Sequence, residues 1–102
     1  MAMHGDPWVA KPAGELDLDR LDEMRELVQD FRRSNAPDAR LDLTAVTFMD
    51  SSALRVLLQL RQTATERGGT VTLVSPCQVV RRLLEVTTLD RLFVLEAESL
   101  DP

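Results

Sequence analysis

The sequence predicts an α/β domain in which a small, mainly parallel (mixed) sheet of about four strands packs against helices. Segments with strand character alternate with segments of helical periodicity, and such alternation implies crossover connections between parallel strands. A β-branched run at residues 70–74 is typical of a central strand. A length of 102 residues suits one domain with its own core. We therefore expect a single domain over residues 7–98, with tails at 1–6 and 99–102.

The N-terminal part predicts an edge strand, a turn and a first helix. Segment 8–10 is placed at a sheet edge because the prolines on either side of it cannot donate ladder hydrogen bonds. Gly14 marks a turn or bend, and Asp17 or Asp19 can cap the helix that follows. The apolar residues of that helix recur at helical spacing and are Leu21, Met24, Leu27, Val28 and Phe31.

The middle of the chain predicts a strand and a long helix before the central strand. The strand includes Leu41 and Leu43, and the helix runs from about Ser52 to Arg67. The Gly68-Gly69 pair stops the helix by supplying a left-handed C-cap at low steric cost. The buried stripe of this helix is expected to consist of Leu54, Leu57, Leu58, Ala64 and the aliphatic stem of Arg61.

The C-terminal part predicts a third helix and a last short strand. Pro76 can occupy the first turn of a helix over about 78–86, and residues 94–95 form the strand. The apolar face of the helix is expected to be Val79, Val80, Leu83 and Leu84.

Composition excludes several classes of function. The formal net charge is −5, whereas a general nucleic-acid binder needs clustered basic charge. No apolar run is long enough to insert into a membrane, and no secretory signal is visible. Cys77 is the only cysteine and His4 the only histidine, which leaves little basis for a disulfide, a zinc site or a histidine-based triad. We therefore expect a cytoplasmic protein without catalytic activity, metal or cofactor.

The most informative segment is the loop that ends in Asp50-Ser51-Ser52, where the long helix begins. Any of these side chains can cap the free N–H groups of the helix start, and the helix dipole favours an anion there. Phosphorylation of a serine would add a charge of about −1.5 to −2. The helix would tolerate that charge, but an acidic or apolar partner surface would be repelled. The same three residues also fit an ordinary helix cap with no further function.

The order of several blocks resembles the STAS domain, the module shared by sulfate transporters and anti-sigma factor antagonists. The resemblance begins at Gly14-Glu15-Leu16-Asp17, continues through 41–54 and 68–76, and ends near 89–93. Single-domain members are similar in length and act as bacterial anti-sigma factor antagonists. Their fold is a small sheet packed on helices with the serine loop exposed at one end, so the resemblance implies a STAS-like version of the predicted fold class.

The resemblance also implies a partner switch. An unphosphorylated member binds an anti-sigma factor, which then releases its sigma factor. The anti-sigma factor is often a serine kinase that uses ATP and magnesium. It phosphorylates the antagonist, and the complex then separates. A phosphatase restores binding. The serine phosphorylated in the family matches Ser52, and Ser51 is the second candidate. The implied partner-binding residues are Asp17, Asp50, Ser51, Ser52, Ala53 and Arg55.

Two positions depart from the Asp-Ser-Ser-Gly-Leu-Gly motif of that family, because Ala53 and Arg55 replace its glycines. Alanine favours a helix over glycine by roughly 1 kcal/mol. Arg55 is larger and cationic. It can obstruct a partner that expects bare backbone, or it can pair with a phosphate on Ser52.

Other functions fit parts of the same sequence. The loop could dock a partner constitutively, as in a STAS scaffold subunit of an ABC-type lipid transport complex or of a stress-sensing complex. A serine hydrolase is disfavoured because His4, the only histidine, lies in the expected tail. A short edge strand leaves room for a weak homodimer. Trp8 either covers the sheet edge or contacts a partner.

Overall fold

The computed structural model describes residues 5–97 of the chain. Two short 3-10 turns, η1 (Leu18–Arg20) and η2 (Asp90–Leu92), accompany the regular elements. The regular elements are β1 (Trp8–Ala10), β2 (Gly14–Leu16), α1 (Leu21–Ser34), β3 (Ala39–Asp42), β4 (Val46–Met49), α2 (Ser51–Glu66), β5 (Val71–Val74), α3 (Gln78–Val86) and β6 (Val94–Glu96). Residues 1–4 and 99–102 of the expected tails lie outside the described residues.

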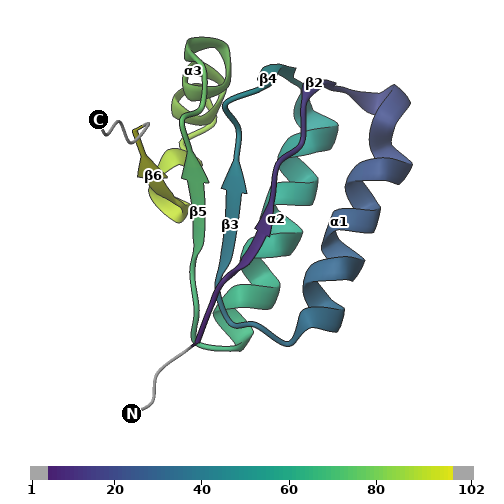
Figure 1. The fold of residues 1–102 in the computed structure, drawn as a ribbon. Coiled ribbons are helices and arrows are strands. Elements are labelled where there is room, and N and C mark those ends of the chain that lie inside the picture. Colours follow the sequence, from purple (N-terminus) through teal and green to yellow (C-terminus); the bar gives the residue numbers. More distant parts are fainter. Residues whose placement is uncertain (1–4, 98–102) are drawn as a thin grey trace.

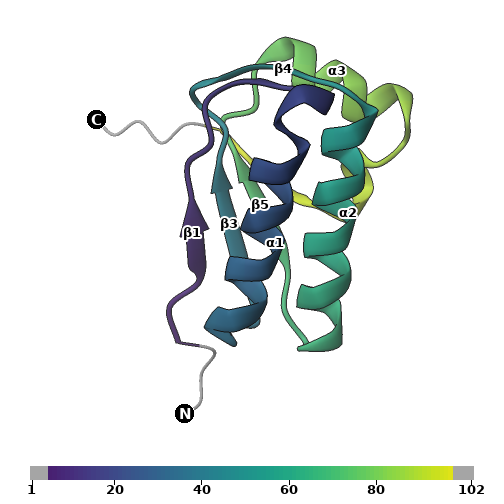
Figure 2. The same cartoon turned by 90° about the vertical axis from the view of Figure 1, so that its right-hand side faces the viewer.

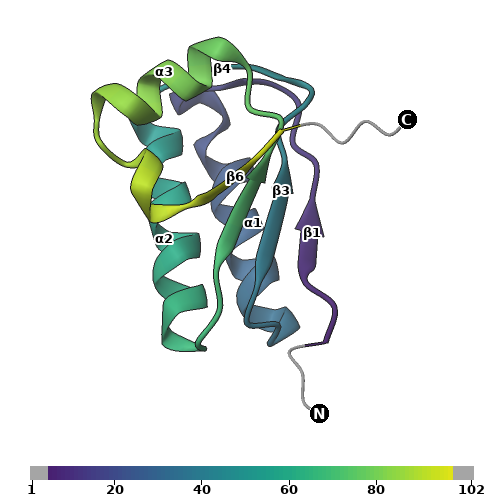
Figure 3. The same ribbon diagram turned by 90° about the vertical axis from the view of Figure 1, so that its left-hand side faces the viewer.

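Four parallel strands form the main sheet, in the order β1-β3-β5-β6. The predicted α/β class is therefore confirmed, with β1 at an edge and β5 in the centre as expected. Helices α1 and α2 lie side by side over one face of this sheet (Figure 1 and Figure 2). In the described part of the chain no helix covers the opposite face (Figure 3).

A second, two-stranded sheet pairs β2 with β4 in parallel. Gly14, where the sequence predicted a turn or bend, begins β2, and the register of the strand pair shifts between Gly14 and Glu15. The Gly14 N–H donates to the Ala45 carbonyl at 2.8 Å. The glycine is needed there, since its φ of +83° is strained for other residues. This small sheet lies at the end of the molecule where α1 and α2 begin (Figure 1).

The core lies between the main sheet and the two long helices. Phe31 of α1, Leu60 of α2 and Leu73 of β5 have no exposed surface. The predicted stripe of α2 is buried at Leu54, Leu57 and Ala64 and half-buried at its other positions. Trp8 covers the sheet edge: its ring centroid lies 5.2 Å from that of Phe31, and its Nε1 donates to Asp30 at 2.8 Å.

Helix α3 corrects one predicted core residue. Val80 and Leu84 are buried and Leu83 is half-buried, but Val79 is 51% exposed. A helix of nine residues that lies across the end of the molecule packs along a narrow stripe, and positions 80 and 84 share that stripe at a spacing of four. Val79 lies beside it and faces away from the core.

The glycine pair after α2 ends the helix as the sequence predicted. Gly68 has a φ of +76° and donates to Thr65, and Gly69 donates to Ala64 at 2.7 Å. These two bonds make a Schellman motif. None of the helices within residues 5–97 has the length and apolar character needed to cross a membrane.

Candidate functional site

Asp50 organises the start of helix α2 with both of its carboxylate oxygens. Its Oδ1 accepts from the backbone N–H groups of Ser52 (2.9 Å) and Ala53 (3.3 Å), which makes it the N-cap. Its Oδ2 accepts from the Leu18 N–H at 3.2 Å. Of the three side chains that could cap this helix, Asp50 is therefore the one that does so. It also joins the helix to η1.

The pairing of β2 with β4 brings Asp17 beside the serine loop, which we define as Asp50-Ser51-Ser52. Leu16 pairs with Met49, so Asp17 and Asp50 follow neighbouring residues of parallel strands. The Asp50 N–H donates to the Leu16 carbonyl at 3.3 Å. Asp17 itself accepts from the Asp19 N–H at 3.1 Å and so caps η1, the turn that leads into α1.

The two serines occupy the first and second positions of α2. Ser51 is exposed and Ser52 is half-buried. Within the described residues neither hydroxyl forms a hydrogen bond, because Asp50 already satisfies the N–H groups that a serine cap would use. Both hydroxyls are therefore free to react, and neither is sealed inside the protein.

Ser52 lines a cleft of about 190 Å³ between the first turns of α1 and α2, which we call the serine cleft. Helix α2 contributes residues three, four and seven positions after Ser52, the spacing that places side chains on one helix face. The residues that line the serine cleft are Leu18, Leu21, Arg25, Ser52, Arg55, Val56 and Gln59.

The two residues that replace the expected glycines have different surroundings. Ala53, one of the predicted partner-binding residues, is only 2% exposed and belongs to the core, so its side chain offers almost no surface to a partner. The sequence could not show this, because the inward face of α2 depends on how the helix packs. Arg55 is exposed and lines the serine cleft. Arg25 lines it too, although no pattern in the sequence connects Arg25 with the serines.

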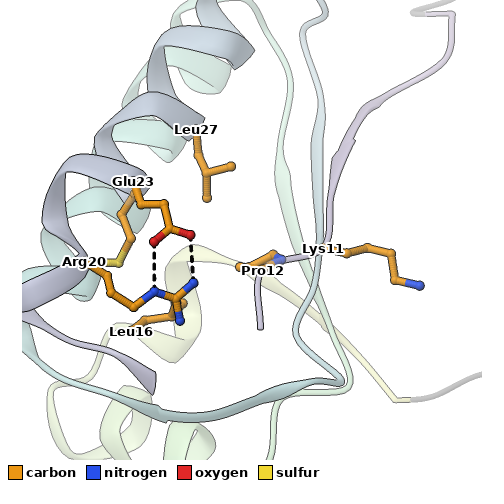
Figure 4. Close-up of a pocket in the computed structure, with 7 residues that line it drawn as sticks. Lys11, Pro12, Leu16, Arg20, Glu23 and Leu27 are labelled. Carbon is orange, nitrogen blue, oxygen red and sulfur yellow. Dashed lines mark hydrogen bonds and ion pairs between the residues drawn. The ribbon is translucent and has the colours of Figure 1, made fainter. Parts of the chain in front are cut away.

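Arg20 holds the segment that leads to Asp17. Its Nη1 donates to the carbonyls of Ala13 (2.5 Å) and Glu15 (3.1 Å), while Nε and Nη2 donate to the two Glu23 oxygens (Figure 4). These hydrogen bonds from Arg20 lower the pKa of the Glu23 carboxyl. Arg20 also lines a separate cleft of about 230 Å³ with the apolar residues Leu16, Met24 and Leu27.

Within residues 5–97 the side chains needed for a metal centre or a histidine-based hydrolase are absent from the site. Among residues 5–97 no group of three or more His, Cys, Asp or Glu side chains could hold a metal ion. His4, the histidine considered for a hydrolase, lies outside the described residues. Cys77 is half-buried at the start of α3, and its side chain makes no capping hydrogen bond there.

Comparison with known proteins relates the whole described domain to one family. The family described as Mlab, STAS domain, matches residues 2–96. An anti-sigma-B factor antagonist from Staphylococcus epidermidis is 25% identical over 86 residues, which are 84% of this chain and 80% of that protein.

Two solved structures share the fold. A proposed anti-sigma factor antagonist from Thermotoga maritima is 27% identical with a TM-score of 0.80, over 90% of this chain and 79% of that one. An anti-sigma factor antagonist from Mycobacterium paratuberculosis is 25% identical with a TM-score of 0.76, over 86% and 74% of the two chains. With the family match over residues 2–96, these likenesses lead to one conclusion: the chain belongs to the STAS-domain family.

Proposed function

We propose that this chain is an anti-sigma factor antagonist that works by partner switching. In its unphosphorylated state it binds an anti-sigma factor, which is also a serine kinase, and the bound sigma factor is released. Phosphorylation of Ser52 ends the binding. The observation that carries this proposal is that Ser52, which is half-buried, lines the serine cleft while Asp50 performs the capping that a serine would otherwise provide.

The proposed modification is a phosphoryl transfer from ATP. The Ser52 Oγ forms a bond to the γ-phosphorus, the bond from that phosphorus to the β–γ bridging oxygen breaks, and ADP leaves. The hydroxyl proton passes to a base supplied by the kinase. A separate phosphatase reverses the change by hydrolysis. This chain is then a substrate in the cytoplasm, without catalytic activity of its own.

Charge and geometry explain how such a change would alter binding without unfolding the domain. The phosphate adds a charge of about −1.5 to −2 at the positive end of the α2 dipole, where an anion is favourable. The hydrogen bonds that build the helix start come from Asp50 and are unaffected. The new charge therefore acts on the surface that meets a partner, and the domain keeps its fold.

The experiment is a co-purification that identifies the partner, followed by incubation of the two proteins with ATP and magnesium. Mass spectrometry should place phosphate on Ser52, and Ser51→Ala should still be phosphorylated. Ser52→Ala should bind the partner at all times. Ser52→Asp should weaken binding only in part, because a carboxylate carries less charge than a phosphate and fewer acceptor oxygens.

Two results would overturn the proposal that phosphorylation of Ser52 is the switch. Phosphate found on Ser51 alone would move the acceptor to the exposed neighbour. Absence of phosphate, with equal partner binding by Ser52→Ala, Ser52→Asp and the unaltered chain, would favour a scaffold that docks constitutively.

A further inference from the structure

We infer that Arg25 and Arg55 of this chain form a binding site for the phosphate of phosphoserine 52. The inference rests on the proposed function, since it concerns the modified form of Ser52. It adds to that function two cationic residues that hold the modification, one from each of the helices that wall the serine cleft.

The position of Arg55 follows from helical geometry. Arg55 stands three residues after Ser52 on α2, a spacing at which side chains are neighbours on the helix surface. Both residues line the serine cleft. A phosphate on the Ser52 Oγ therefore enters a space that the Arg55 side chain already borders.

Arg25 comes to the cleft from the opposite wall. It stands four residues after Leu21 on α1, and both line the cleft. Helices α1 and α2 pack against each other along their lengths (Figure 2). The serine cleft is thus lined by one arginine on the helix of Ser52 and by a second on the neighbouring helix.

Among residues 5–97 neither guanidinium group has an anionic partner, which is also true of Arg81, Arg82 and Arg91. Arg25 and Arg55 differ from those three because they line the serine cleft. Four other cations of the described chain, Lys11, Arg20, Arg33 and Arg40, form ion pairs with acidic residues. Arg25 and Arg55 form neither an ion pair nor a hydrogen bond with any other described residue, although the chain carries a net charge of −5. Guanidinium groups bind phosphate oxygens in a bidentate manner, and two of them balance a charge of about −2.

Nearby carboxylates do not occupy this site. Asp50 directs both oxygens to the backbone of α2 and η1, and Asp17 is bound to the Asp19 N–H. Asp19 is exposed on η1 and Glu23 is paired with Arg20. Asp22 stands three residues before Arg25 on α1, but no ion pair joins the two. Arg25 and Arg55 are therefore open to an anion that arrives on Ser52.

The test uses the full chain produced with phosphoserine at position 52 by codon suppression, so it needs neither kinase nor partner. The second pKa of the phosphate is measured by phosphorus NMR titration. The arginines should lower it by about one unit relative to the double variant Arg25→Gln/Arg55→Gln. Each single variant should give an intermediate value, and Arg→Lys at either position should restore part of the shift. Circular dichroism checks that all chains remain folded.

Arg33→Gln is the matched control, because it removes an arginine from α1 eight residues after Arg25, roughly 12 Å away along the helix. It should leave the phosphate pKa unchanged. An equal phosphate pKa in the unaltered chain and in the double variant would overturn the inference. A shifted pKa combined with a partner that binds both forms equally would leave the phosphate site intact and refute the proposed switch instead.

Discussion

Asp50→Ala should destabilise the domain by about 2 kcal/mol, because one side chain supplies two separate connections. The hydrogen bonds to the Ser52 and Ala53 N–H groups are an N-cap, which is worth about 1 kcal/mol. The hydrogen bond from Leu18 to the second oxygen ties α2 to η1 and contributes about 1 kcal/mol more. In a domain of this size the sum corresponds to a decrease in Tm of roughly 10 °C.

Asp50→Asn separates the two contributions. Asparagine caps a helix as well as aspartate does, but its amide nitrogen cannot accept the Leu18 N–H. The asparagine variant should therefore lose about half of what the alanine variant loses. Glu26→Ala is the control, since Glu26 is exposed in the middle of α1 and has no ion pair or hydrogen bond within the described residues.

Urea denaturation measures these differences in stability. The fluorescence of Trp8 and circular dichroism report the unfolding. Trp8 is the only tryptophan, and it is buried against Phe31, so its emission reports on the core. If the Asp50→Ala midpoint is no lower than that of Glu26→Ala, Asp50 does not hold the helix start. The serine would then have to be considered as the cap.

Two further predictions concern the rest of the domain. Gly69→Ala should prevent stable folding or lower Tm steeply, since its Cβ would lie 2.0 Å from the Pro37 carbonyl oxygen. Gly68→Ala, which is in open space at a φ of +76°, should destabilise the domain by only about 1 kcal/mol. Thermal melts compare the two variants. Hydrogen bonds from Arg40 lower the pKa of the Glu96 carboxyl, so that this group stabilises the fold at neutral pH and loses its contribution as pH falls through the lowered value. Glu96→Gln should accordingly be less stable than the unaltered chain at pH 7, and in urea titrations the two should converge as the pH falls through the lowered pKa of Glu96. A constant difference at all pH values would contradict the pairing.

Local signals were enough to predict much of the fold. The periodicity of α1 and α2 and the Gly68-Gly69 stop depend on residues close in sequence, and the structure has them. The edge position of β1 also followed from local chemistry, because the prolines beside this strand have no backbone N–H to donate to a neighbouring strand. The capping pattern of Asp50-Ser51-Ser52 and the family resemblance together predicted the serine loop as the site.

Non-local packing decided what the sequence could not. Gly14 begins a strand because it pairs with Val46 of β4 and donates to the Ala45 carbonyl. No residue close to Gly14 in the sequence predicts that pairing. Val79 is apolar and at helical spacing, yet the angle at which α3 crosses the molecule leaves it exposed. Arg25 is 27 positions from Ser52 in sequence, and only the packing of α1 against α2 joins them in one cleft.

Asp50 caps helix α2 and Ser52 does not, and this difference matters for any partner that binds at Ser52. Because Asp50 fixes the helix start and also binds the Leu18 N–H, the walls of the serine cleft are held relative to each other whether or not Ser52 is modified. In the proposed function, a partner that approaches Ser52 would meet both walls, including Leu18, which is 64% exposed. A phosphate placed between these walls changes charge and occupied volume at the centre of that contact surface. In the proposed switch, phosphorylation of Ser52 at a site held in this way would produce a large change in binding without a change in fold.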